Sequence, residues 1–476
     1  MRRALLLAAV VLLAAAGCGG SDTSSSSGAG EVAAIVPASA PLLIALETDR
    51  ESEQWQQAEE LLNRFPGKQR LLDEVRKGLA EEDVDLDADL LPALGDETYL
   101  AVLDFEGGGD NVVVITKPGD KEKFAKLLRE SDDPTVTREV GGWTLVAETE
   151  TALDRLEEGD RLEDAAWFEA AQGRVEDDAL VTLFANGAAI GEALREGIPS
   201  DCDLPDAYGK LEYATATIAA EKGGLRAWFA AKGDGVDQLV QGDSLLSLVP
   251  AGAFAYLGSP GFDPEQFGLS AQLRCALEGE EVPDLERELG VSFDDLVDLF
   301  AGGYALYVRS AALIPEVTLL LAPEDDARAV ATLDELAEKA AALGGAEVER
   351  KSVGETEARE LTFGPVSILY GAGDGRVVVT TARAGFDALA GEGDKLEDDE
   401  GFRSVREAAG VGEDDEVFAY FDLRGLAELI DRFAGFAEQD LPPEVEANLE
   451  PLTGFIAWGD LSDPNDVEAG AFLEIR

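Results

Sequence analysis

V-P-A-S-A-P-L-L-I-A-L, at Val36–Leu46, returns as V-P-A-G-A-F-A-Y-L-G-S at Val249–Ser259. Four further pairs of similar segments keep the same order along the chain: 84–96 with 291–303, 112–118 with 317–323, 162–168 with 396–402, and 176–184 with 413–421. Colinear similarity over most of a chain indicates an internal duplication. We therefore predict two tandem repeated units, one over residues 32–240 and one over residues 241–476.

Each predicted unit combines short strands with helices. Short apolar or alternating runs bounded by Gly, Asp or Pro indicate strands, for example at 42–47 and 112–116 in the first unit and at 316–321 and 376–380 in the second. Helices are expected at 51–65, 68–80, 121–128, 152–156, 325–343 and 423–436. Glycine clusters at 107–110 and 371–375 favour tight reversals between antiparallel neighbours. The predicted fold class is α+β, with each unit a mainly antiparallel sheet packed with helices.

The N-terminus has the features of an export signal for a lipoprotein. Arg2 and Arg3 precede an apolar run at 4–16, and Ala15-Ala16-Gly17-Cys18 follows, with Ala where Leu is more usual. We expect a signal peptide at 1–17, cleavage before Cys18, acylation of Cys18, and a Ser/Gly-rich linker at 18–31. Several acyl chains would anchor the protein stably to the membrane. The alternative is a plain secretory signal with an incidental Cys18, and either reading places the folded part outside the cytoplasm.

Composition excludes several classes of function. The chain of 476 residues has 98 acidic and 38 basic side chains, so binding to a nucleic-acid backbone is disfavoured. The same imbalance disfavours electrostatic adsorption to anionic lipid surfaces, and we interpret the acidity as a solvated surface. No histidine occurs, which removes Ser-His-Asp and Cys-His nucleophilic sites and His-ligated metals. An apolar fraction of 46% is sufficient for a folded core.

The chemistry-bearing residues form no recognisable catalytic motif. Cys202 and Cys275 are suited to one disulfide in an oxidising compartment, and two buried free thiols remain the alternative. No nucleophile elbow, Ser-x-x-Lys, phosphate-binding loop or dinucleotide fingerprint occurs. We therefore predict no catalytic, cofactor-binding or metal-binding residues.

Three local features were candidates for a binding site. Asp83, Asp85, Asp87 and Asp89 have a spacing similar to the start of a calcium loop, but we favour an acidic helix N-terminus. The five tryptophans are expected in the core or docking helices onto a sheet: Trp55, Trp143, Trp167, Trp228 and Trp458. A groove between the two units, near 233–249, is the place that a duplicated architecture recommends for a ligand.

The chain resembles the bacterial domain-of-unknown-function 3352 family. The resemblance rests on the opening V-P-A-S-A-P-L-L-I-A-L, the first helix running to Asn63-Arg64-Phe65-Pro66, and L-L-P-A-L-G-D-E-T-Y-L-A-V-L at 90–103. It implies an exported or membrane-anchored protein and supplies no activity or site residues. We expect a lipid-anchored envelope protein that binds a ligand or protein partner without catalysis. A two-carboxylate hydrolase of envelope glycans and a solute-binding lipoprotein of a transporter are the alternatives, so enzyme activity stays open.

Overall fold

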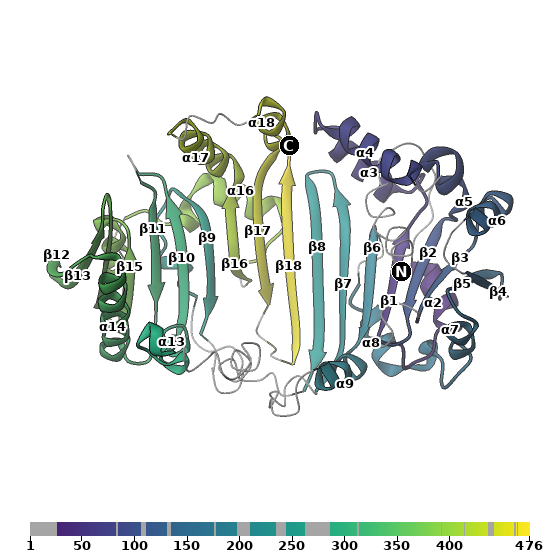
Figure 1. The fold of residues 1–476 in the computed structure, drawn as a ribbon, viewed down its shortest axis with the longest axis horizontal. Coiled ribbons are helices and arrows are strands. Elements are labelled where there is room, and N and C mark those ends of the chain that lie inside the picture. The colour runs from purple at the N-terminus through teal and green to yellow at the C-terminus, as the bar shows by residue number, and fades with distance from the viewer. Residues whose placement is uncertain are drawn as a thin grey trace.

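The computed structural model describes residues 26–81, 84–105, 111–130, 135–175, 178–197, 210–234, 244–261, 286–311, 314–391, 393–413, 415–436, 442–460, 463 and 465–476. Within these ranges, eighteen strands form one sheet in which all neighbouring strands are antiparallel (Figure 1). The strands are β1 (Leu42–Glu47), β2 (Glu97–Val102), β3 (Val112–Thr116), β4 (Val136–Val140), β5 (Trp143–Ala147), β6 (Val181–Asn186), β7 (Leu211–Glu221), β8 (Gly224–Gly233), β9 (Ala253–Pro260), β10 (Gly303–Arg309), β11 (Glu316–Leu321), β12 (Val348–Val353), β13 (Thr356–Phe363), β14 (Val366–Gly373), β15 (Arg376–Thr380), β16 (Glu416–Asp422), β17 (Leu452–Asp460) and β18 (Asp466–Ile475).

From one edge of the sheet to the other, the strand order is β4, β5, β3, β2, β1, β6, β7, β8, β18, β17, β16, β9, β10, β11, β15, β14, β13 and β12. The α+β class with an antiparallel sheet is therefore confirmed. Pairing of β8 with β18 joins the N-terminal and C-terminal halves at the middle of the sheet. This arrangement does not match the parallel α/β lobes that a solute-binding protein of a transporter would require.

Helices and helical turns lie on both faces and at the ends of the strands (Figure 1). In the N-terminal half they are α2 (Ser26–Ala33), α3 (Glu53–Leu62), α4 (Lys68–Ala80), η1 (Leu86–Leu90), α5 (Leu91–Ala93), α6 (Lys121–Glu130), α7 (Glu150–Arg155), η3 (Leu162–Asp164), α8 (Ala166–Gln172) and α9 (Gly187–Gly197). In the C-terminal half they are η5 (Leu246–Leu248), α13 (Phe293–Asp298), α14 (Asp326–Gly344), η6 (Arg383–Phe386), α15 (Asp387–Ala390), η7 (Leu396–Asp398), α16 (Glu400–Ala408), α17 (Leu423–Phe436) and α18 (Pro443–Leu449).

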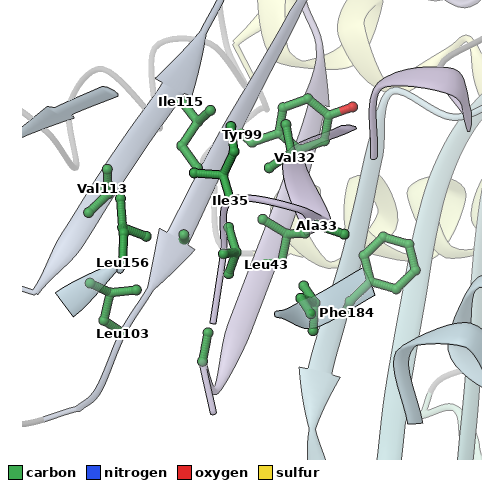
Figure 2. Packing of buried hydrophobic residues seen from close by; sticks show 14 of the residues in the cluster. Val32, Ala33, Ile35, Leu43, Tyr99, Leu103, Val113, Ile115, Leu156 and Phe184 are labelled. Atoms are coloured by element: carbon green, nitrogen blue, oxygen red, sulfur yellow. The ribbon is translucent and has the colours of Figure 1, made fainter. Parts of the chain in front are cut away.

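One face of the sheet, here called the covered face, is packed under short helices in two separate cores. The first core draws only on residues between 29 and 213, including α2, α7, η3 and α8 (Figure 2). The second draws its buried members from residues between 245 and 472, including η5, α15, η7 and α16. Between them, Arg174 after α8 forms ion pairs with Asp466 and Glu468 on β18. The chain thus builds two cores on one continuous sheet.

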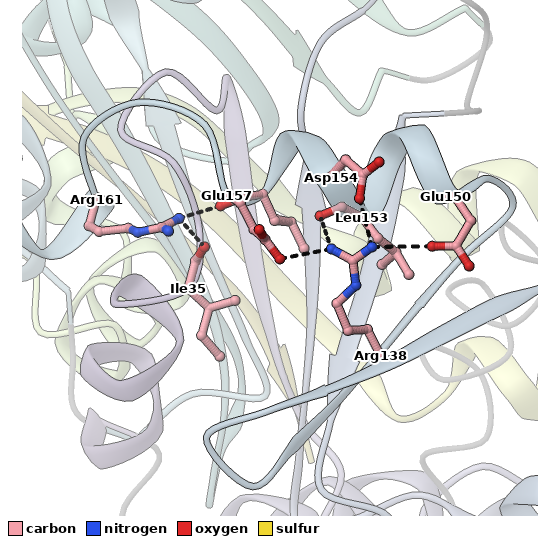
Figure 3. Close-up of polar contacts among 8 residues, drawn as sticks. Ile35, Arg138, Glu150, Leu153, Asp154, Glu157 and Arg161 are labelled. Carbon is pink, nitrogen blue, oxygen red and sulfur yellow. Dashed lines mark hydrogen bonds and ion pairs between the residues drawn. The ribbon is translucent and has the colours of Figure 1, made fainter.

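Polar contacts hold α7 against the edge of the first half (Figure 3). The Arg138 guanidinium on β4 donates to the carboxylates of Glu150, Asp154 and Glu157 at 3.2, 2.7 and 2.9 Å. It also donates to the carbonyl of Leu153 at 3.2 Å, one of the carbonyls near the C-terminal end of α7. Because the three carboxylates are exposed, each ion pair stabilises only modestly, and the cluster mainly positions the edge strand.

The opposite face, here called the open face, carries apolar side chains that are mostly half-buried or exposed. Directly paired residues share a face, so the face can be followed across the sheet: Ile218 on β7 lies opposite Ala227 on β8, which lies opposite Ala471 on β18. Its members are Val112, Val114, Leu100, Val102, Leu42, Ile44, Val181, Leu183, Ala216, Ile218, Leu225, Ala227, Phe229, Ala469, Ala471, Leu473, Phe455, Ala457, Ala419, Phe421, Ala255, Leu257, Leu306, Val308, Val317 and Leu319.

Parts of this open face are strongly exposed. Ile218, Phe229, Leu257 and Val317 keep 42%, 41%, 41% and 38% of their surface accessible. In Figure 1 the middle strands β7, β8 and β18 face the viewer without a helix in front of them. A solvated sheet face ordinarily carries polar side chains, and contiguous exposed apolar surface marks a place of interaction. The open face is therefore the part of the described fold that most needs a partner.

Candidate ligand-binding site

Helix α3 and the open face enclose an apolar pocket of about 330 Å³. This volume lies at the lower end of the range of about 300–1,000 Å³ found for small-molecule sites. All of its lining residues except Glu47 are apolar, and they come from α3 and the segment after it, from β1, β6, β7, β8 and β18, and from Leu180. They are Leu46, Glu47, Trp55, Ala58, Leu61, Leu62, Phe65, Leu180, Val181, Ile218, Leu225, Leu473 and Ile475. The exposed Ile218 connects the pocket to the rest of the open face.

Three polar contacts fix α3 over the sheet. The Ser52 hydroxyl caps the helix by accepting from the Trp55 backbone N–H at 3.3 Å. The Trp55 indole N–H donates to the Glu47 carbonyl at 2.8 Å, and the Gln54 side chain accepts from the Ala220 backbone N–H at 2.8 Å. Trp55, Ala58 and Leu61 then pack with Ala220 and Ile475. The helix is thus attached to the end of β1 and to β7.

Two carboxyl groups, one buried and one half-buried, lie side by side where β1 ends and β2 begins. Glu47 on β1 pairs with Glu97 on β2. Burial raises the pKa of Glu47 to about 8, and the negative charges of Asp49, Glu97 and Asp96 act in the same direction. Burial also raises the pKa of Glu97, whose carboxylate accepts from the Tyr99 hydroxyl at 2.8 Å. Glu47 is therefore largely protonated at neutral pH.

Basic residues lie beside the pocket lining at one end. Arg64 precedes the lining residue Phe65, and its guanidinium donates to the carbonyls of Ile475 and Lys222, the latter at 2.9 Å. Lys222 lies in the turn between β7 and β8 and its side chain is exposed. No carboxylate side chain of the described residues forms an ion pair with Arg64 or Lys222. The neighbouring cations Arg226 and Arg476 are in contrast paired with Glu221 and Glu474.

The candidate cysteines lie outside the described residues. These are Cys18, predicted to be lipidated, and Cys202 and Cys275, the possible disulfide. The acylation and the disulfide stay predictions.

The described part of the acidic segment 83–89 forms the start of a helical turn. Asp85 accepts from the backbone N–H groups of Asp87 and Ala88 and so caps η1, as predicted for an acidic helix N-terminus. Asp87 pairs with Arg76, and Asp89 pairs with Lys126 at 2.8 Å. Asp83 lies outside the described residues. Across the described ranges, no cluster of three or more potential metal-ligating side chains occurs.

The groove predicted between the two units, near 233–249, stays a prediction. The halves meet through the main-chain pairing of β8 with β18, and most of 233–249, from 235 to 243, lies outside the described residues. The tryptophan prediction is confirmed: Trp55, Trp143 and Trp458 are buried, and Trp167 and Trp228 pack partly buried against the two cores. Sequence reasoning missed the pocket, because its lining is assembled from six separated segments.

The described helices include none that is both long and apolar enough to cross a membrane. The pocket lining contains a single carboxyl residue, whereas glycoside hydrolysis ordinarily uses two. The arrangement can therefore hold an apolar group, and it shows no pair of acids placed for glycan cleavage at this pocket.

Comparison with known proteins gives few relatives. No curated protein matches the chain. Among solved structures, crystal form III of TP0453 matches with 10% identity and a TM-score of 0.23, covering 47% of this chain and 89% of that one. Crystal form I of TP0453 matches with 14% identity and a TM-score of 0.22, covering 43% and 79%. These similarities are too low to support an argument.

A family model described as "Protein of unknown function (DUF3352)" matches residues 4–141. The match includes β1, α3 and β2, the segments on which the resemblance in the sequence rests. This match confirms, for residues 4–141, the resemblance to the DUF3352 family.

Proposed function

We propose that this protein is a non-enzymatic, lipid-anchored envelope protein that binds an apolar ligand outside the cytoplasm. The observation that carries the proposal is the apolar pocket beneath α3, which continues into the exposed open face. Burial of apolar surface supplies roughly 25 cal/mol per Å², so a hydrocarbon group entering this pocket is strongly favoured. The export signal that ends at Cys18 supports the location and the anchor.

We further propose that the fold arose by duplication of one α+β unit, with units at 32–240 and 241–476. The connections support this: β1 lies between β2 and β6, and β9 lies between β10 and β16 in the same way. Isolated bridges join Pro37 with Arg161 in one half and Pro250 with Lys395 in the other. The hairpin β12–β13 would then be an addition to the second unit.

Substitution of Ile218 by Glu is expected to weaken binding of a neutral apolar probe by about tenfold or more, because a carboxylate at the pocket would have to be desolvated. The measurement is fluorescence titration of the full chain with N-phenyl-1-naphthylamine. Ile430→Glu on α17 is the matched control, since Ile430 has an exposure of 41% against 42% for Ile218 and does not line the pocket. Equal binding by both variants, or no binding by the parent chain, would contradict the proposal.

Cys18→Ser is expected to release the protein from the membrane, because the serine hydroxyl cannot form the thioether of a lipoprotein. The measurement is the distribution of the protein between membrane and soluble fractions of its own cells after a salt wash. Cys202→Ser is the control and should stay with the membrane. A Cys18→Ser protein that remains in the membrane fraction would refute the anchor.

A further inference from the structure

Resting on the proposed function, we propose that the pocket beneath α3 binds the single alkyl chain of an anionic amphiphile, with its headgroup at Arg64 and Lys222. The guanidinium of Arg64 is fixed at the rim, since it donates to the carbonyl of Ile475, a lining residue. Its second bond, to the carbonyl of Lys222, places the backbone of the exposed lysine beside it. The Arg64 charge thus adjoins one end of the apolar cavity, and the exposed Lys222 lies in the neighbouring turn.

Among the described residues, no carboxylate forms an ion pair with Arg64 or Lys222. Glu221, next to Lys222, is paired with Arg226, and Glu474, next to Ile475, is paired with Arg476. A guanidinium has five N–H donors, and the described protein contacts of Arg64 use two of them. The remaining donors suit a carboxylate or phosphate oxygen, to which hydrogen bonds from a charged donor are stronger than neutral ones.

The chemistry of the wall favours a hydrocarbon chain over a peptide. A peptide segment would bring backbone N–H and C=O groups into the cavity, and each group buried without a partner costs free energy. The lining offers these groups almost no polar partner, because Glu47 is its only polar residue. An alkyl chain has no polar group to satisfy, and it can continue from the pocket past Ile218 along the open face.

The large negative charge of the chain does not prevent local binding of an anion. At an ionic strength of about 0.1 M, interactions between exposed charges fade beyond about 10 Å. The headgroup therefore responds mainly to Arg64 and Lys222.

The test compares three twelve-carbon ligands that differ in charge: dodecanoate, 1-dodecanol and dodecyltrimethylammonium. Each is titrated below its micellar concentration into the full chain, with calorimetry at pH 7. We expect dodecanoate to bind at least tenfold more tightly than dodecyltrimethylammonium. Arg64→Gln/Lys222→Gln should weaken dodecanoate binding about tenfold or more and leave dodecanol binding unchanged. Lys222→Gln alone, which removes no described contact of the folded chain, should show a smaller loss of the same sign.

Arg70→Gln/Lys77→Gln on α4 is the matched control, since it removes the same charge away from the pocket lining. It should change dodecanoate affinity by less than twofold. If dodecanol and dodecanoate bind equally, and the Arg64/Lys222 variant binds like the parent, the anionic headgroup is refuted while the apolar site stands. If none of the three ligands binds, the proposed function itself fails.

Discussion

Phe402→Ala is expected to lower the free energy of unfolding by about 3–5 kcal/mol, because it leaves a cavity in a packed core. Phe402 on α16 is fully buried, and its ring packs edge-to-face on Tyr420 of β16 with centroids 5.1 Å apart. Phe168 on α8 packs on Phe184 of β6 in the same way, with centroids 4.9 Å apart. Phe168→Ala should therefore cost a similar amount, and urea denaturation followed by circular dichroism measures both.

Phe229→Ala is the matched control for these two variants. The same ring is removed from the open face, where Phe229 keeps 41% of its surface exposed, so the loss should stay below about 1 kcal/mol. A loss for Phe229→Ala equal to that for Phe402→Ala would show that the open face is covered in solution. That outcome would contradict an accessible open face.

The strands in the interior of the sheet could be predicted from sequence, and the two edge strands could not. The predicted bounds of β1, β3, β11 and β15 agree with the structure residue for residue. In contrast β4, with the sequence V-T-R-E-V, and β12, with V-E-R-K-S-V, were not predicted. Each pairs on one side only, and charged side chains are typical of such edges because they discourage further pairing. The signal that identifies an interior strand is therefore absent from them.

Tight turns were predictable because they depend on local geometry. The glycine cluster at 371–375 indicated a reversal, and β14 and β15 indeed form a hairpin in which Gly373 pairs with Arg376. Asp374 and Gly375 between them have φ values of 53° and 72°, the combination that a two-residue type I′ turn requires. The other cluster, at 107–110, lies outside the described residues.

The exact correspondence between the strands of the two halves could not be predicted from the sequence alone. In the similar segments 176–184 and 413–421, Phe184 corresponds to Phe421. In the sheet, Phe184 lies opposite Leu43. The residue that corresponds to Leu43 in the second half is Tyr256, and it lies opposite Tyr420. The structure therefore matches Phe184 with Tyr420, one residue before Phe421. An irregularity between Val417 and Ala419 displaces the strand by one residue, which moves every later side chain to the other face.

The open face was unpredictable for a different reason. Several strands are apolar at both alternating positions, as in V-V-V-I-T of β3, and this pattern indicates that both faces are shielded from water. Sequence alone cannot say whether a helix of the same chain or an external ligand shields each face. The pocket adds contacts between residues as distant as Trp55 and Ile475, which no local pattern predicts.

Glu47→Gln is expected to stabilise the protein at alkaline pH and to have little effect near pH 5. The pKa of Glu47 is raised from 4.5 to about 8, so between these values the folded chain keeps a proton that the unfolded chain releases. The stability of the parent should therefore fall with rising pH by at most about 1.4 kcal/mol per pH unit through this window. Glutamine removes this dependence, and its side-chain oxygen can still accept from the Asp49 backbone N–H.

Urea denaturation at pH 5, 6, 7 and 8 measures the effect as a difference between the parent chain and the variant. The difference should grow with each step and reach a few kcal/mol at pH 8. Glu97, whose pKa burial also raises, remains in the variant, so the variant should keep a smaller decline of its own. Glu150→Gln, which alters an exposed carboxylate of the Arg138 cluster, should show a pH-independent difference from the parent. A flat difference for Glu47→Gln would mean that water reaches this carboxyl and that it is charged at neutral pH.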